Sequence, residues 1–205
     1  MAFSLDNCRK LTTRYENLSP EEQAVIEMMA VYYAPAAYKH LLRCCSGCQI
    51  RSSSGKSYSQ PMLRTVIKGL QQKKLVVQVS GKGMICHRDV VEVITRRIVA
   101  RGDFEQLAQD IVEACRGYEF RWHYYNVNPD ILLRNIRIAF YTHDFNQIME
   151  LYERILDFQL GFTSQSFPLI DIVAHPFDIE FIDTLPSQMV RWVVDILYAH
   201  QLYYL

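Results

Sequence analysis

The chain has 205 residues, half of them hydrophobic, and such a composition excludes a disordered protein. No apolar run approaches the ~20 residues that a membrane-spanning helix needs, and the early acid Asp6 argues against a signal peptide. Because no apolar run is long enough, we also expect no membrane partner. Six cysteines are too sparse for a disulfide scaffold, so we expect reduced thiols and a cytoplasmic location.

The formal net charge is zero, but the charges are distributed unevenly along the chain. Residues 19–101 contain 13 Lys and Arg against 5 Asp and Glu, whereas residues 102–205 contain 6 against 15. A basic half followed by an acidic half is typical of two modules with different partners. We therefore expect a polyanion, DNA or RNA, to bind the basic half and a protein to bind the acidic half.

Residues 1–18 are a polar lead-in, with a short helix expected over Cys8–Tyr15. The sequence Ser19-Pro20-Glu21-Glu22 predicts a helix start, because it combines an N-cap residue, a proline in the first turn and acids that the helix dipole favours. Pro35 ends this helix, and residues 36–45 predict a second one. A connection rich in serine and small residues follows over residues 47–55.

The stretch from Ser59 to Arg88 predicts a helix that leads directly into a β-hairpin. Ser59 is a favourable N-cap, and Pro61 lies in the first turn, where its missing N–H costs nothing. Apolar residues then recur at helical spacing and predict one buried face: Leu63, Val66, Ile67 and Leu70. After Lys74 the sequence favours two short strands, with a glycine-containing turn between them at Ser80–Gly83.

A further helix is predicted over residues 90–100, with Asp89 as its cap. The order helix, helix, helix, strand, strand, helix over residues 19–101 resembles a winged helix-turn-helix domain. The resemblance implies that the helix after Ser59 is the recognition helix and that Ser80–Gly83 is the tip of the wing. It also implies contact with a nucleic acid.

Polar residues on or beside this helix are the candidate nucleic-acid contacts: Arg64, Lys68, Gln71, Gln72, Lys73, Lys74 and Lys82. Arg64 and Lys68 are four residues apart and therefore share a face, opposite the apolar one. Lys and Arg neutralise phosphates, while Arg and Gln can also hydrogen-bond to base edges in the major groove. The alternative is that these charges solvate a winged helix that contacts protein.

Gly102-Asp103 marks a predicted domain boundary, because the charge and the residue pattern change there. The run Ile138–Phe145, followed by Glu150-Leu151-Tyr152, resembles the helical hairpin of tetratricopeptide-type (TPR) repeats. Val99–Phe104 matches the same pattern more weakly. The two Asp-Phe pairs, Asp103-Phe104 and Asp144-Phe145, lie 41 residues apart, within the range of helix-pair repeats. Helices are expected over residues 104–115, 129–141, 144–158, 176–184 and 186–205, with an apolar connection over residues 161–176.

The residues predict no catalytic, metal or cofactor site. Cys44-Cys45-Ser46-Gly47-Cys48 lacks the second close pair of ligands typical of a structural zinc site, so buried structural thiols are the favoured interpretation. The run Ser52–Ser57 lacks the first glycine and the preceding strand of a phosphate loop, and the histidines are scattered. The aromatic stretch Tyr118–Asn128 could stack on bases, but its acidic surroundings favour core packing or a protein groove.

The sequence therefore predicts a mainly α protein with a small β-hairpin wing: a lead-in at 1–18, a winged helix-turn-helix domain at 19–101 and a TPR-like helical domain at 102–205. Together these features resemble the N-terminal accessory regions of large bacterial ATPases, such as Snf2-type helicases, and of some signalling regulators. No ATPase motif is present, so any such activity would belong to sequence beyond Leu205, and we expect a longer parent protein. The expected function is a non-enzymatic nucleic-acid-binding and regulatory module without cofactors; the alternative is a protein–protein interaction scaffold.

Overall fold

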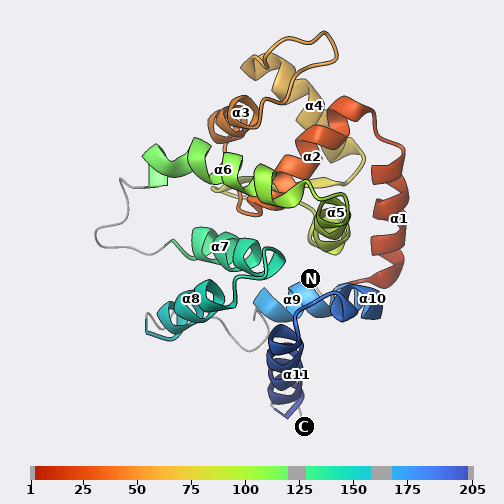
Figure 1. Cartoon of the computed structure of the whole chain (residues 1–205). Coiled ribbons are helices and arrows are strands. Elements are labelled where there is room, and N and C mark those ends of the chain that lie inside the picture. Colours follow the sequence, from red (N-terminus) through yellow and green to blue (C-terminus); the bar gives the residue numbers. More distant parts are fainter. Residues whose placement is uncertain (1–2, 120–127, 158–167, 203–205) are drawn as a thin grey trace. The chain divides into compact units, whose positions relative to one another are not determined.

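The computed structural model describes residues 3–119, 128–157 and 168–202 (Figure 1). These residues form helices and one small antiparallel sheet, which confirms the predicted mainly α class. The elements are α1 (Leu5–Glu16), α2 (Pro20–Tyr32), α3 (Tyr38–Gly47), α4 (Gln60–Gln72), β1 (Val76–Val79), β2 (Gly83–Cys86), α5 (Arg88–Ala100), α6 (Phe104–Glu119), α7 (Pro129–Tyr141), α8 (Phe145–Asp157), α9 (Pro168–Ala174), α10 (Ile179–Asp183) and α11 (Ser187–Leu202). Among the described residues, no helix combines the length and the apolar character needed to cross a bilayer.

Contacts divide the chain into two compact units, residues 1–134 (the first unit) and residues 135–205 (the second unit). The boundary predicted at Gly102 falls inside the first unit, because α6 packs on α2 and α3. Ala108 and Ile111 on the apolar face of α6 are buried and so belong to the same core as the preceding helices. That residues 19–101 fold without α6 stays a prediction.

The N-terminal helix α1 is longer than the predicted Cys8–Tyr15 segment, because the Ser4 side chain caps it by accepting a hydrogen bond from the Asn7 backbone N–H. The helix packs on α5, and the Asn7 side chain donates a hydrogen bond to the Asp89 carboxylate over 2.8 Å. The N-cap of α5 is His87 and not, as predicted, Asp89; Asp89 lies in the first turn of that helix. The lead-in is thus part of the core of the first unit.

The β-hairpin is tied to the segment between α2 and α3. Ala36 forms an antiparallel bridge with Met84, in which each backbone N–H donates to the other residue's carbonyl over 2.9 Å. The sequence predicts a helix from Ala36, but α3 begins at Tyr38 because this bridge keeps the preceding backbone extended. Beside it, Gly83 has a φ of +125°, and a Cβ there would lie 2.3 Å from the Ala36 carbonyl oxygen, so the position requires glycine.

Aromatic contacts hold the second unit together. Phe140 and Tyr141 pack edge to face with ring centroids 5.7 Å apart, and Phe181 lies against both rings. Trp192 packs edge-on against Phe145 and Tyr152. These rings join the C-terminal part of α7 to α10, and α8 to α11, and edge-to-face pairs of this kind add to the free energy of burying the rings.

The connection predicted over residues 161–176 is wrong for its described part. Residues 168–174 form helix α9, because Pro168 begins a helix instead of interrupting one. In place of the helix predicted over residues 176–184, the structure has the shorter helix α10 (Ile179–Asp183). The Asp178 side chain caps it by accepting a hydrogen bond from the Phe181 N–H over 3.1 Å. Residues 158–167, and residues 120–127 of the predicted aromatic stretch, lie outside the described residues.

The two Asp-Phe pairs lie in turns with the same hydrogen bonds. In each turn the aspartate N–H donates to the carbonyl five residues earlier, over 3.2 Å for Asp103 and 2.9 Å for Asp144. The preceding residue, Gly102 or His143, has a positive φ, as in helix ends closed by a left-handed residue. The two segments therefore match in local backbone, while their assignment to tetratricopeptide-type repeats stays a prediction.

Helices α3 and α6 approach closely at Gly47, where a Cβ would lie 2.8 Å from the Ala114 Cβ. We expect Gly47→Ala to destabilise the first unit by about 1–3 kcal/mol, because overpacking forces the two helices apart. Urea unfolding measures the change, and Ser46→Ala, at an exposed neighbouring position, is the matched control. Ala114→Gly should recover part of the loss in the Gly47→Ala background; strictly additive effects would contradict this contact.

Candidate nucleic-acid interface

Helix α4 presents one apolar face to the core and leaves the other to solvent. The Ser59 side chain accepts a hydrogen bond from a backbone N–H in the first turn. Leu63, Ile67 and Leu70 are completely buried, as their spacing predicts, while Val66 is half-buried at the edge of this face. The core contacts therefore fix the rotation of α4 and, with it, the direction of each polar side chain.

Two of the predicted contacts, Lys68 and Gln72, are exposed on the outward face of α4. They share it with Pro61 and Thr65, since residues at helical spacings of four, seven and eleven lie on one side. Thr65 was not among the predicted contacts, although its place in the helical pattern identifies it. Its hydroxyl donates to the Pro61 carbonyl over 3.2 Å. The outward face thus offers a charge, an amide and a hydroxyl to a ligand.

Arg64 and Gln71 lie on the side of α4 toward α3. The guanidinium carbon of Arg64 is 5.1 Å from the centre of the Tyr38 ring, a cation–π contact, and the Arg64 side chain stays exposed. Gln71 is half-buried. Stacking on Tyr38 therefore orients the Arg64 guanidinium without removing it from solvent.

Lys73 makes an ion pair within the first unit. Its ammonium contacts the carboxylate of Glu22, which lies in the first turn of α2. Burial raises the pKa of Glu22, but the hydrogen bond and charge of Lys73 and the hydrogen bonds from Ser19 outweigh it and hold this pKa below its ordinary value. Lys73 therefore offers less charge to a nucleic acid than the sequence indicates. Its neighbour Lys74 is exposed, with a φ of +60°.

The hairpin contributes little positive charge. Lys82 is the one charged residue between Val76 and Cys86, and its ammonium lies 3.0 Å from the Asp130 carboxylate. A partly exposed pair of this kind adds little stability. Because the two charges are opposite and close, however, their fields largely cancel at larger distances.

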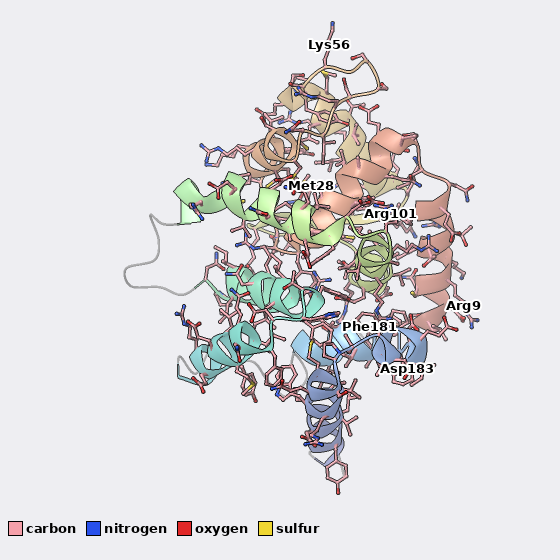
Figure 2. All side chains as sticks on the ribbon, viewed as in Figure 1. Arg9, Met28, Lys56, Arg101, Phe181 and Asp183 are labelled. Atoms are coloured by element: carbon pink, nitrogen blue, oxygen red, sulfur yellow. The ribbon has the colours of Figure 1, made fainter. Side chains whose placement is uncertain are left out.

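Further basic residues lie beside α4 that the sequence analysis did not select. Arg43 lies on α3, and Arg51 and Lys56 lie on the loop that joins α3 to α4. Figure 2 shows Lys56 projecting from that loop. A simple signal in the sequence would have found them: between Glu27 and Asp89 there are ten Lys and Arg and no Asp or Glu. The full basic segment is therefore broader than the recognition helix and wing.

The cysteine-rich end of α3 packs against α6. The sulfur atoms of Cys44 and Cys115 lie 3.7 Å apart in the core, and this contact together with burial raises the pKa of Cys44. Burial raises the pKa of Cys45 and Cys48 to about 12, so these thiols are protonated at neutral pH. Across residues 3–119, 128–157 and 168–202, no group of three or more His, Cys, Asp or Glu side chains could hold a metal ion.

Comparison of the chain with protein-family models, curated proteins and solved structures found no match in any of the three. The winged-helix and Snf2-type resemblances therefore stay predictions from the residues. The functional argument depends on the geometry and charge of the first unit.

We expect Lys73→Met to raise the pKa of Glu22, because burial then acts without the compensating cation. A carboxylate with a lowered folded-state pKa stabilises the fold above its unfolded value, near 4.5, and this contribution is lost as the pH falls through the folded-state value. The wild-type chain should therefore lose more stability on acidification through this window than Lys73→Met does. Urea unfolding at a series of pH values measures the difference.

The matched control is Lys74→Met, which removes the same charge one residue away at an exposed position. Its pH profile should follow that of the wild-type chain. Equal acid sensitivity of Lys73→Met and the wild-type chain would show that the Lys73–Glu22 pair does not set the Glu22 pKa.

Proposed function

We propose that this chain is a non-enzymatic DNA-binding and regulatory module in which residues 19–101 are a winged helix-turn-helix domain. The order α2, α3, α4, β1, β2, α5 supports the proposal. The bridge between Ala36 and Met84 also supports it, because it adds a one-residue third strand to the hairpin. In this arrangement α4 takes the place of the recognition helix.

The observation that carries the proposal is the basic segment without acids between Glu27 and Asp89. It contains α3, α4, their connecting loop and the hairpin. The first unit has 19 Lys and Arg against 13 Asp and Glu, a formal charge of +6, while the second has 3 against 9, a formal charge of −6. Phosphates are attracted to the first unit and repelled by the second.

The outward face of α4 suits the major groove of duplex DNA. An exposed helix fits that groove, and lysine and glutamine side chains can hydrogen-bond to guanine and adenine edges there. In this proposal Lys68, Gln72 and Thr65 face the bases, and Arg64 reaches a base or phosphate from the side. The deep, narrow major groove of an RNA duplex does not admit a helix. Duplex DNA is therefore the ligand that the geometry favours over RNA.

Protein binding by the second unit is the second candidate function, and exposed apolar side chains favour it. Large apolar residues there are 56–66% exposed: Phe177, Ile179, Val194 and Tyr198. Val194 and Tyr198 are four residues apart on α11 and share a face. In the scaffold alternative this surface carries the function, and the cations of the first unit serve solvation. In an Snf2-type accessory region, DNA and protein contacts would serve together in a longer parent.

We expect Arg64→Ala/Lys68→Ala to weaken DNA binding by roughly 1–3 kcal/mol and to reduce the slope of log affinity against log salt concentration. Both side chains are exposed, so the free energy of unfolding should change by about 0.5 kcal/mol or less. Fluorescence anisotropy with duplex and single-stranded probes at two salt concentrations measures the binding. Lys73→Ala should have a smaller effect, because Glu22 already neutralises that lysine.

Arg9→Ala/Lys10→Ala is the matched control, since it removes two exposed cations from α1. It should leave the affinity close to that of the wild-type chain. If the wild-type chain binds neither probe at low salt, the DNA-binding proposal fails and the scaffold alternative replaces it.

The first unit alone should bind DNA at least as tightly as the whole chain, because the second unit adds nine acids and three cations. A chain of residues 1–134 preserves the packing of α6 on α2 and α3, so it should fold. Anisotropy with the same duplex at low salt compares the two proteins. Weaker binding by residues 1–134, with an intact thermal transition, would show that the second unit contributes contacts of its own.

A further inference from the structure

We infer that the loop between α3 and α4, residues 51–57 (the α3–α4 loop), and not the β-hairpin, is the second DNA-contacting element beside α4. The inference rests on the proposed function and specifies its surface. A winged helix is expected to touch the backbone with its wing, so the inference departs from what the resemblance alone implies.

The hairpin is poorly suited to hold a phosphate. Its one cation, Lys82, is paired with Asp130 at 3.0 Å. The backbone beside it is fixed, because Met84 is bridged to Ala36 and Gly83 lies against the Ala36 carbonyl. Reaching a phosphate with Lys82 would require breaking its ion pair and would leave the Asp130 carboxylate facing the DNA.

The α3–α4 loop is an ordered projection with its own hydrogen bonds. Arg51 and Ser57 form an antiparallel bridge, and the Arg51 guanidinium also donates to the Ser57 hydroxyl. The Ser52 N–H donates to the Lys56 carbonyl over 2.9 Å, and the Ser52 hydroxyl donates to the same oxygen over 3.0 Å. Ser52 is 6% exposed, and Gly55 turns the chain with a φ of +75°. Little ordering entropy remains to be lost when such a loop binds.

The charge of this region has one sign. Residues 38–72 contain six Lys and Arg and no Asp or Glu. Arg43 and Arg51 line a groove of about 310 Å³ between α3 and the loop, together with the hydroxyl-bearing Ser46 and Ser57. Guanidinium and hydroxyl groups are the donors that proteins use to hold phosphate oxygens.

The acid Glu21 is bonded to Tyr58, which also lines this groove. Glu21 on α2 accepts a hydrogen bond from the Tyr58 hydroxyl over 2.9 Å. The loop leads to the N-terminus of α4, where Ser59 is the N-cap. A DNA strand whose phosphates contact the loop would therefore continue toward the outward face of α4. The α3–α4 loop therefore positions the DNA backbone, while α4 contacts the bases.

The test compares four variants of the full chain with the wild type, using a fluorescein-labelled duplex DNA and anisotropy across a salt series. Arg51→Ala/Lys56→Ala should weaken binding at least about tenfold and lower the salt slope by about two, since each phosphate contact contributes about 0.9. Lys82→Ala should change affinity less than about twofold. Arg9→Ala/Lys10→Ala removes the same charge from α1, at the opposite end of the first unit from Lys56 (Figure 2), and should match the wild type.

Lys56→Ala alone guards against a folding artefact, because Arg51 also bonds within the loop. This single variant should lower the salt slope by about one with an unchanged thermal midpoint. If Lys82→Ala weakens DNA binding more than Arg51→Ala/Lys56→Ala does, the inference is wrong and the wing is the contact. Equal losses in Arg51→Ala/Lys56→Ala and Arg9→Ala/Lys10→Ala would overturn it as well, since net charge alone would then explain both. A wild-type chain that binds no duplex would instead refute the proposed function.

Discussion

The first unit depends on one helix, α2, whose C-terminal half is almost entirely buried. Glu27 in this half is bonded to Arg101, and its apolar neighbours are buried: Val25, Ile26, Met28, Met29, Ala30 and Val31. A helix of this kind has to be surrounded, because any exposed side would leave apolar area in water. α3, α4, α5, α6 and β2 all pack on it. The position of α4, and therefore of the outward face that carries Lys68, follows from this shared core.

Local patterns were enough to predict the elements that carry their own start signals. Ser19 and Ser59 cap α2 and α4 as their sequences indicate, and the apolar spacing after Ser59 gives the buried face correctly. The bridge at Ala36 could not be predicted, because it depends on a backbone partner far along the chain, Met84. α9 was missed because Pro168 suits both a loop and a helix start, and a local pattern cannot choose between them.

In the candidate site, too, local patterns predict some features, whereas others depend on distant parts of the chain. Helical periodicity places Lys68 and Gln72 on the outward face without knowledge of the fold. It cannot show that Glu22 neutralises Lys73 or that Asp130 neutralises Lys82, since both acids come from other elements. Arg51 lies on the loop before α4, where no helical periodicity marks a face; only the run of cations without acids identifies it.

Charge segregation has a consequence for any nucleic-acid ligand. The two units carry opposite formal charges on one chain, so the acidic second unit is always present at a high effective concentration near the basic first unit. Under the proposed function, the acids of the second unit and the phosphates of DNA compete for the cations of the first unit. Salt screens the attraction of both the acids and the phosphates to these cations. Added salt weakens DNA binding more, because the charges on a duplex are spaced more densely than the nine acids of the second unit. A protein partner that covers those acids would therefore strengthen DNA binding by the first unit without touching it, which is a physical basis for regulation.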